Sequence, residues 1–86
     1  MDVEIWLDCA DVEENGHAKV ESKFMEWYND GSEVRHNKMS FSSLTKLDTP
    51  NRYLVDVGYA DVIVSFRNLH ARLHRLGVKV FIHFVH

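Results

Sequence analysis

The spacing of hydrophobic residues along this chain switches between a helical period and a two-residue period. Within residues 61–76 the apolar side chains recur at intervals of four, three, four and three positions: Val62, Phe66, Leu69, Leu73 and Leu76. That spacing places them on one side of an α-helix. We expect Asp61 to cap its N-terminus and Gly77 to end it. A helix over residues 61–76 is therefore predicted.

Strict alternation of apolar and polar residues marks two further segments. Residues 3–9 place Val3, Ile5 and Leu7 on one side, with Glu4 and Trp6 on the other. Residues 52–59 alternate in the same way, and their β-branched and aromatic content favours a strand. Residues 33–47 form a polar, extended segment. Residues 78–85 are apolar on both sides, which predicts a central strand or one whose outer face a partner covers.

Residues 17–29 fit two descriptions. As a helix, they align Val20, Phe24, Trp27 and Tyr28 on one side, and Gly31 suits the helix C-terminus. As a strand, residues 18–24 alternate, and the flanking Asn-Gly and Asn-Asp-Gly segments would suit hairpins. The helix is favoured because it gathers the large side chains on a single face.

With that helix, the element order is strand, helix, strand, strand, helix, strand. Right-handed crossovers then give an α+β fold, a four-stranded antiparallel sheet with two helices on one face, the ferredoxin-like βαββαβ plan. The alternative is a β-meander of three strands followed by one helix and a final strand. Either plan uses residues 1–86 as a single domain, since 86 residues are too few for two.

Composition restricts the compartment and the class of protein. The chain is 45% hydrophobic without a long apolar run, and its first residues are acidic, so neither a spanning helix nor a secretory signal is expected. One cysteine, Cys9, excludes an internal disulfide and favours the cytoplasm. The four glycines are scattered, and no serine lies in a nucleophile elbow. We therefore predict no enzyme activity, no catalytic residues and no cofactor.

Charge is divided unevenly along the chain. Residues 1–33 carry ten acidic and two basic residues, a net charge of −8, whereas residues 34–86 carry eight basic and three acidic residues, a net charge of +5. Two arrangements are compatible with this division: the two parts pair within the fold, or the first part forms an electronegative surface. The second possibility leads to a functional hypothesis.

That hypothesis is a small acidic protein that inhibits a partner protein by surface binding. An acidic face would attract a basic surface, including a groove that normally holds nucleic acid, as in phage anti-defence, antitoxin or immunity proteins. The predicted partner-binding residues are Asp8, Asp11, Glu13, Glu14, Glu21, Glu26 and Asp30, with Trp6, Trp27 and Tyr28 as aromatic anchors. A homodimer formed through the exposed sheet face is a compatible second hypothesis, with Phe81, His83 and Val85 as its contacts.

Three alternatives rest on other residue clusters. His70 and His74 share one side of the helix and could bind zinc. A metal-dependent nuclease would need converging acids, for which the candidates are Asp8, Asp11, Glu13, Glu14, Asp56 and Asp61. A nucleic-acid-binding domain would use the basic helix 61–76, through Arg67, Arg72 and Arg75, with Lys79 beyond it. The net charge of −3 disfavours phosphate binding.

Overall fold

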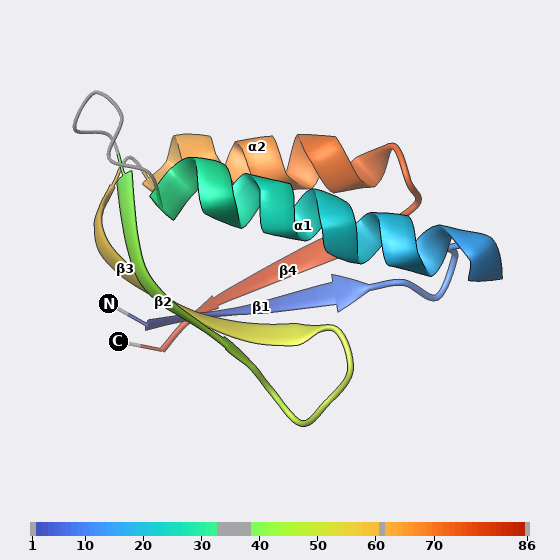
Figure 1. Cartoon of the computed structure of the whole chain (residues 1–86), viewed down its shortest axis with the longest axis horizontal. Coiled ribbons are helices and arrows are strands. Elements are labelled where there is room, and N and C mark those ends of the chain that lie inside the picture. The colour runs from blue at the N-terminus through green and yellow to red at the C-terminus, as the bar shows by residue number, and fades with distance from the viewer. Residues whose placement is uncertain (1, 33–38, 61, 86) are drawn as a thin grey trace.

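The computed structural model describes residues 2–32, 39–60 and 62–85. The elements, in chain order, are β1 (Asp2–Asp8), the 3-10 turn η1 (Glu14–Gly16), α1 (His17–Ser32), β2 (Met39–Lys46), β3 (Arg52–Ala60), α2 (Val62–His74) and β4 (Lys79–Phe84). Both helices cover the same face of one sheet (Figure 1). The predicted α+β fold, with its four-stranded antiparallel sheet and two helices on one face, is confirmed. The predicted N-cap, Asp61, lies outside the described residues.

Residues 17–29, which fit either a helix or a strand in the sequence, belong to helix α1, so the alternative β-meander is wrong. α1 buries Val20, Phe24 and Trp27 to 2% exposure or less, and all three contribute to the core. A strand over the same residues would have placed Trp27 on the opposite side from Val20 and Phe24. The helix forms because it is the conformation that buries the three large side chains together.

The sheet has the order β2-β3-β1-β4, and all three neighbouring pairs are antiparallel. β3 lies between β1 and β2, the two strands that α1 connects, and β1 lies between β3 and β4, which α2 connects. Each helix therefore belongs to a split βαβ unit. The two ends of the chain lie side by side (Figure 1), and the Val85 N–H donates to the Asp2 carbonyl at 2.9 Å.

β4 is an edge strand, so the first of the two alternatives predicted for residues 78–85, a central strand, is wrong. Its two sides are apolar for different reasons. Val80 and Ile82 pack partly against the core, on the helix side of the sheet. On the other side, Phe81 is 48% exposed and stacks on Trp6 of β1 with ring centroids 4.9 Å apart. A run of apolar residues therefore does not distinguish a central strand from an edge strand with an exposed apolar side.

The core lies between the sheet and the helices. Val3, Ile5 and Leu7 of β1 are at most 1% exposed, and Leu69 and Leu73 of α2 are fully buried against them. Tyr53, Val55, Val57 and Phe41 extend the same buried layer across β3 and β2. This arrangement confirms the inward set predicted for β1 and the helical spacing predicted for α2. Within the described residues, no helix covers the other face of the sheet (Figure 1).

α2 ends in a Schellman motif. The Gly77 N–H donates to the His74 carbonyl at 3.0 Å, and the Val78 N–H donates to the Leu73 carbonyl at 3.2 Å. Gly77 has a φ of 84°, in the left-handed region that side chains disfavour. A Cβ at this position would also lie 3.3 Å from the Asp11 carbonyl oxygen. Glycine is therefore required both by the backbone conformation and by the neighbouring loop.

We expect Gly77→Ala to lower the free energy of unfolding by about 1–2 kcal/mol, the cost of a left-handed conformation for an L-residue. Urea unfolding followed by tryptophan fluorescence would measure the change. Gly77→Asn is the matched variant, because asparagine tolerates this conformation better, and it should cost less than alanine. Equal stability of the alanine variant and the parent protein would contradict this account.

Candidate binding surface on the open face of the sheet

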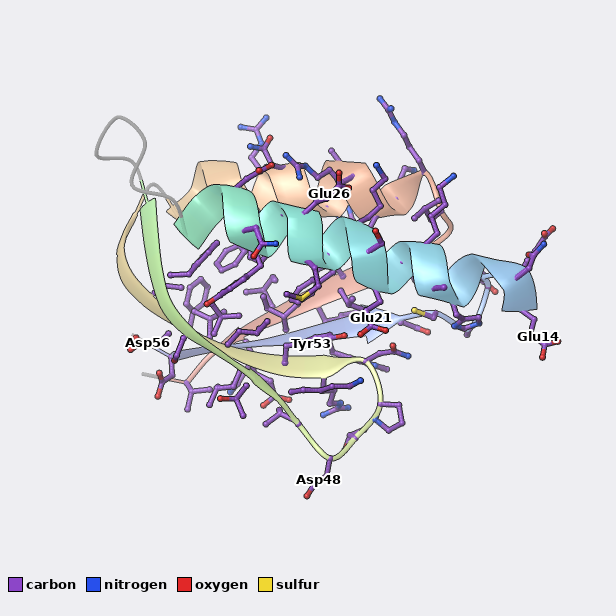
Figure 2. The ribbon with its side chains drawn as sticks, viewed as in Figure 1. Glu14, Glu21, Glu26, Asp48, Tyr53 and Asp56 are labelled. Carbon is purple, nitrogen blue, oxygen red and sulfur yellow. The ribbon has the colours of Figure 1, made fainter. Side chains whose placement is uncertain are left out.

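The sheet face opposite the helices carries the outward side chains of the strands, and we call it the open face. Successive side chains of a strand point to opposite faces, so the residues that alternate with the buried ones in β1, β3 and β4 lie on the open face. They are Asp2, Glu4, Trp6, Asp8, Arg52, Leu54, Asp56, Lys79, Phe81 and His83. Figure 2 shows Asp56 on this side and Tyr53 pointing to the helix side. Neither α1 nor α2 covers the open face (Figure 1).

Three strands bring Arg52, Trp6 and Phe81 into one row across the open face, at the start of β3. Trp6 pairs with Arg52 of β3 on one side and with Phe81 of β4 on the other. Its ring stacks on Phe81 at 4.9 Å, and the Arg52 guanidinium carbon lies 4.9 Å from the ring centroid of Trp6. Trp6 is thus held between a second aromatic ring and a cation, an arrangement that fixes its orientation.

Arg52 also contacts a carboxylate in the next row. Its Nη1 donates to Glu4 Oε1 at 3.3 Å, and both side chains are about one-third exposed. No described residue accepts a hydrogen bond from the buried Nε atom of Arg52. A small pocket of about 240 Å³ lies here, lined by Glu4, Trp6, Arg52, Phe81, Ile82 and His83. The pocket combines apolar walls with one carboxylate and one cation, a combination that suits an inserted side chain.

Carboxylates lie in the rows of the open face on both sides of this aromatic row. Asp2 lies directly opposite Asp56, and Asp8 lies opposite Lys79. The open face therefore carries four carboxylates against two permanent cations, Arg52 and Lys79. Beyond Asp8 the chain continues into a loop with three more exposed acids, Asp11, Glu13 and Glu14. The negative potential thus extends from the open face to the start of α1.

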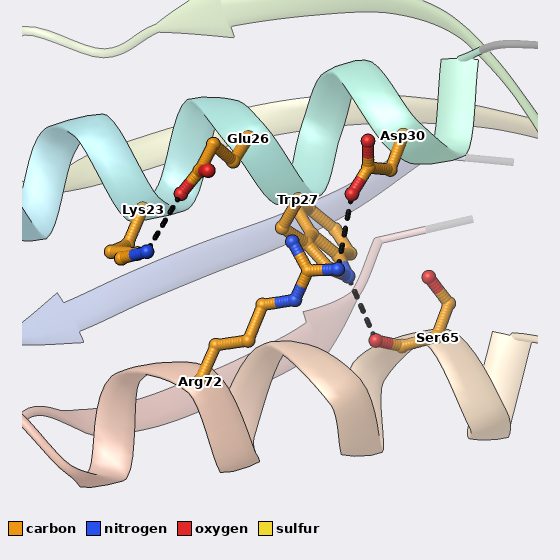
Figure 3. A network of polar contacts seen from close by, with 6 residues as sticks. All are labelled: Lys23, Glu26, Trp27, Asp30, Ser65 and Arg72. Atoms are coloured by element: carbon orange, nitrogen blue, oxygen red, sulfur yellow. Dashed lines mark hydrogen bonds and ion pairs between the residues drawn. The ribbon is translucent and has the colours of Figure 1, made fainter.

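The remaining predicted acidic residues lie elsewhere, so the acids do not form one continuous face. Glu26 and Asp30 line the groove between α1 and α2, where Glu26 pairs with Lys23 at 3.1 Å and Asp30 pairs with Arg72 at 3.0 Å (Figure 3). Glu21 lies on another side of α1, close enough for its charge to affect Tyr53 (Figure 2). The acidic first part of the chain is thus partly neutralised by the basic second part.

The three predicted aromatic anchors have three different environments. Trp6 lies on the open face, where it lines the pocket described above. Trp27 is only 2% exposed, and its indole N–H donates to the Ser65 carbonyl of α2 at 2.8 Å (Figure 3). It is a core residue, and its assignment as a partner anchor is wrong. Tyr28 is half-buried and stacks on Phe41 with centroids 5.4 Å apart.

The predicted dimer residues lie at the outer edge of the sheet. Phe81 and His83 belong to the open face and are exposed, and Val85, just beyond β4, is 37% exposed. Phe81 and His83 line the same pocket as Trp6. The structure therefore unites one predicted partner anchor and two predicted dimer residues in a single surface.

Neither metal hypothesis gains support from the arrangement of the described residues. The rings of His70 and His74 lie 6.0 Å apart and both side chains are exposed. Within residues 2–32, 39–60 and 62–85, no three potential ligands of the His, Cys, Asp and Glu types come close enough to hold a metal ion. Asp61, one of the acids of the nuclease hypothesis, lies outside these ranges.

The groove between the helices has a volume of about 720 Å³ and contains side chains of both charges. Its cations are Lys19, Lys23, Arg72 and Arg75, and two of them pair with Glu26 and Asp30. Arg72, a central residue of the predicted basic helix, is thus already paired. The groove is a less basic surface than the sequence of α2 alone indicates.

Two buried groups on the helix side have raised pKa values. Burial raises the pKa of the Cys9 thiol above its ordinary 9.0, and the nearby Asp8 charge adds to the effect. Burial likewise raises the pKa of the Tyr53 hydroxyl above 10.0, with further contributions from Glu21 and Cys9. Both groups therefore keep their protons in the folded protein at pH values where the unfolded chain releases them.

We expect stability to fall with rising pH in the alkaline range. As the pH passes the unfolded values of 9.0 and 10.0, the unfolded chain binds fewer protons than the folded chain, so the free energy of unfolding decreases. Below these values the contribution is fully present. Urea unfolding across this range would measure the slope, and Cys9→Ala and Tyr53→Phe should each reduce it. A stability that rises with alkaline pH would contradict the pKa directions.

Comparison with known proteins gives no family for this chain. No protein-family model matches it, and no curated protein is significantly similar to it in sequence. Within the described residues, neither helix is long and apolar enough to cross a membrane. The candidate site therefore has to be interpreted from its own geometry.

Proposed function

We propose that this protein acts without catalysis, by binding a basic partner protein through the open face and blocking the surface that it covers. The observation that carries the proposal is the stacked Trp6–Phe81 pair, held by Arg52 and flanked by carboxylates. Among the functions considered, inhibition by surface binding fits best with an acidic, compact chain that carries no catalytic signature.

The aromatic row supports a protein interface. Tryptophan and arginine are enriched among the residues that dominate binding energy, especially near the centre of an interface. Trp6 and Arg52 lie on the two central strands, and Phe81 leaves 48% of its surface available for a partner. Since the Phe81 ring is already ordered by stacking, its burial would cost less side-chain entropy than that of a mobile residue.

The carboxylates favour a protein partner over a nucleic acid. A sheet that binds RNA stacks bases on its aromatic residues and attracts phosphates with surrounding cations. Here Glu4 and Asp8 lie in the rows next to the aromatic pair, Asp2 and Asp56 lie two rows away, and these carboxylates would repel phosphates. The same carboxylates would attract lysine and arginine side chains, and they would speed association at low salt.

The test begins with affinity capture from the producing cells, followed by measurement of the affinity for the captured partner. Phe81→Ser should weaken binding about thirtyfold or more, the loss typical of a central contact residue. His70→Ser is the matched control, since it changes an exposed ring on the helix side of the molecule. We expect it to bind like the parent protein.

Salt dependence tests the electrostatic part of the proposal. Binding should weaken as the salt concentration rises, and Glu4→Gln should reduce that dependence while it preserves the shape of the side chain. The proposal fails if Phe81→Ser and His70→Ser bind equally well. A captured ligand that is a nucleic acid would instead favour the alternative function.

A further inference from the structure

The outer edge of β4 offers unpaired backbone groups to a second chain. In an antiparallel pair, alternate residues direct both N–H and C=O toward the same neighbour. Val85 donates its N–H to Asp2 of β1, so the odd-numbered residues of β4 face β1. Val80, Ile82 and Phe84 therefore direct their backbone groups outward, and no described strand pairs with them there.

Edge strands are usually protected against such pairing by prolines, bulges or charged side chains. β4 has the sequence KVFIHF, with one lysine at its start, and its pairing with β1 is regular throughout. Two of its apolar residues are also exposed, Phe84 to 54% and Phe81 to 48%. β4 thus lacks the features that normally prevent strand addition.

We propose that a second copy of this chain pairs antiparallel with β4, so that two four-stranded sheets join across a two-fold axis. The axis passes through Ile82, because only this register gives all three outward-facing residues a hydrogen-bonded partner. Ile82 then pairs with its own copy, and Val80 pairs with Phe84 of the second copy.

The side chains are self-complementary in this register. On the helix side, the new cross-strand neighbours are all apolar: Val80 with Phe84, and Ile82 with Ile82. On the open face, Phe81 lies opposite His83, and Lys79 lies opposite Val85. A shift of the axis by one residue toward Phe81 would place Lys79 opposite His83, and a shift toward His83 would place two His83 rings opposite each other. The register centred on Ile82 therefore avoids both contacts between basic groups.

This inference does not depend on the proposed inhibitor function, because it rests on the outward backbone groups of β4, although Phe81 and His83 contribute side chains to both surfaces. The pairing would place the two open faces side by side on one continuous sheet. In this dimer, Phe81 of one copy lies opposite His83 of the other at the joined strand edges. The sequence suggests these residues as contacts of a dimer in which the two open faces stack on each other.

Residue-resolved amide exchange on the unmodified protein tests the pairing directly. At concentrations where sedimentation velocity detects a dimer, the amides of Val80, Ile82 and Phe84 should exchange at least about tenfold more slowly than in the dilute monomer. The amides of Phe81 and His83, which already pair with β1, should change less. This pattern would locate the contact at the outer edge of β4.

Two variants separate the backbone contribution from the side-chain contribution. Ile82→Pro removes an outward N–H without removing a bond to β1, so it should abolish the dimer and leave a folded monomer. Ile82→Ala truncates the same side chain but keeps the N–H, and it should still dimerise, with lower affinity. A monomeric mass at every concentration up to near-millimolar would overturn the proposal. So would a dimer in which the amides of Val80, Ile82 and Phe84 remain unprotected, since that dimer would use another surface.

Discussion

Replacing Phe24 with alanine is expected to produce one of the two largest losses of stability in this protein. Phe24 is fully buried between α1 and β3, where its ring stacks on Tyr53 at 4.2 Å and contacts Trp27 at 5.6 Å. Truncation of a buried phenylalanine costs about 3–5 kcal/mol. Since domains of this size have a total stability of only about 5–15 kcal/mol, the variant should be close to unfolding at ambient temperature.

Thermal unfolding followed by circular dichroism would measure the effect, which should exceed about 12 °C at the midpoint. Phe81→Ala is the matched control, because it makes the same chemical change at a ring that is 48% exposed. Its effect should be less than half as large. Equal losses for the two variants would mean that Phe24 does not occupy the centre of the core.

Much of the fold could be predicted because helices and strands bury residues at different spacings. The apolar spacing in α2 fits only a helix, and the alternation in β1 fits only a strand. The bounds of both elements were predicted within a few residues. The order of the strands was harder to infer, since it depends on which strands meet in space. Val80 and Phe81 are both apolar, but one faces the core and the other faces Trp6. Alternation along the strand predicts that Phe81 lies on the exposed face, but its contact with Trp6 depends on the register of β4 against β1, which the sequence alone does not show.

The candidate site was predicted in separate parts. Trp6 was expected to contact a partner, and Phe81 was expected to contact a second copy, but their stacking follows from the register of β1 with β4. Arg52 was missed, although its place at the start of a strand, out of phase with Tyr53 and Val55, indicates an outward side chain. The division of the acids could have been predicted. Glu21 and Glu26 are five positions apart, and at about 100° per residue they lie on different sides of a helix.

The error over Trp27 has a physical reason. The apolar stripe of α1 includes it, so its burial was predictable, but it was assigned as an anchor because it is an aromatic residue within the acidic part of the chain. A tryptophan can be fully buried when its N–H finds an acceptor, and here the acceptor is the Ser65 carbonyl, 38 positions away in the chain. No local pattern in the sequence indicates that contact.

Trp27→Ala should therefore rank with Phe24→Ala, at a cost of about 3–5 kcal/mol. The indole contacts Phe41 at 4.8 Å and Phe66 at 5.9 Å, so its removal would leave a cavity where α1, α2 and β2 meet. Trp27→Phe keeps most of the ring and loses the hydrogen bond to Ser65, so we expect a smaller loss of about 1–3 kcal/mol. Urea unfolding monitored by circular dichroism would rank the two variants.

The same conservative variant separates a structural role from a binding role. Under conditions where Trp27→Phe remains folded, it should bind the captured partner with the affinity of the parent protein, because the indole contributes almost nothing to the surface. Phe81→Ser, on the open face, should lose binding with little loss of stability. If folded Trp27→Phe lost affinity as strongly as Phe81→Ser, the partner would have to contact the helix side as well, and the open face would not be a sufficient binding surface.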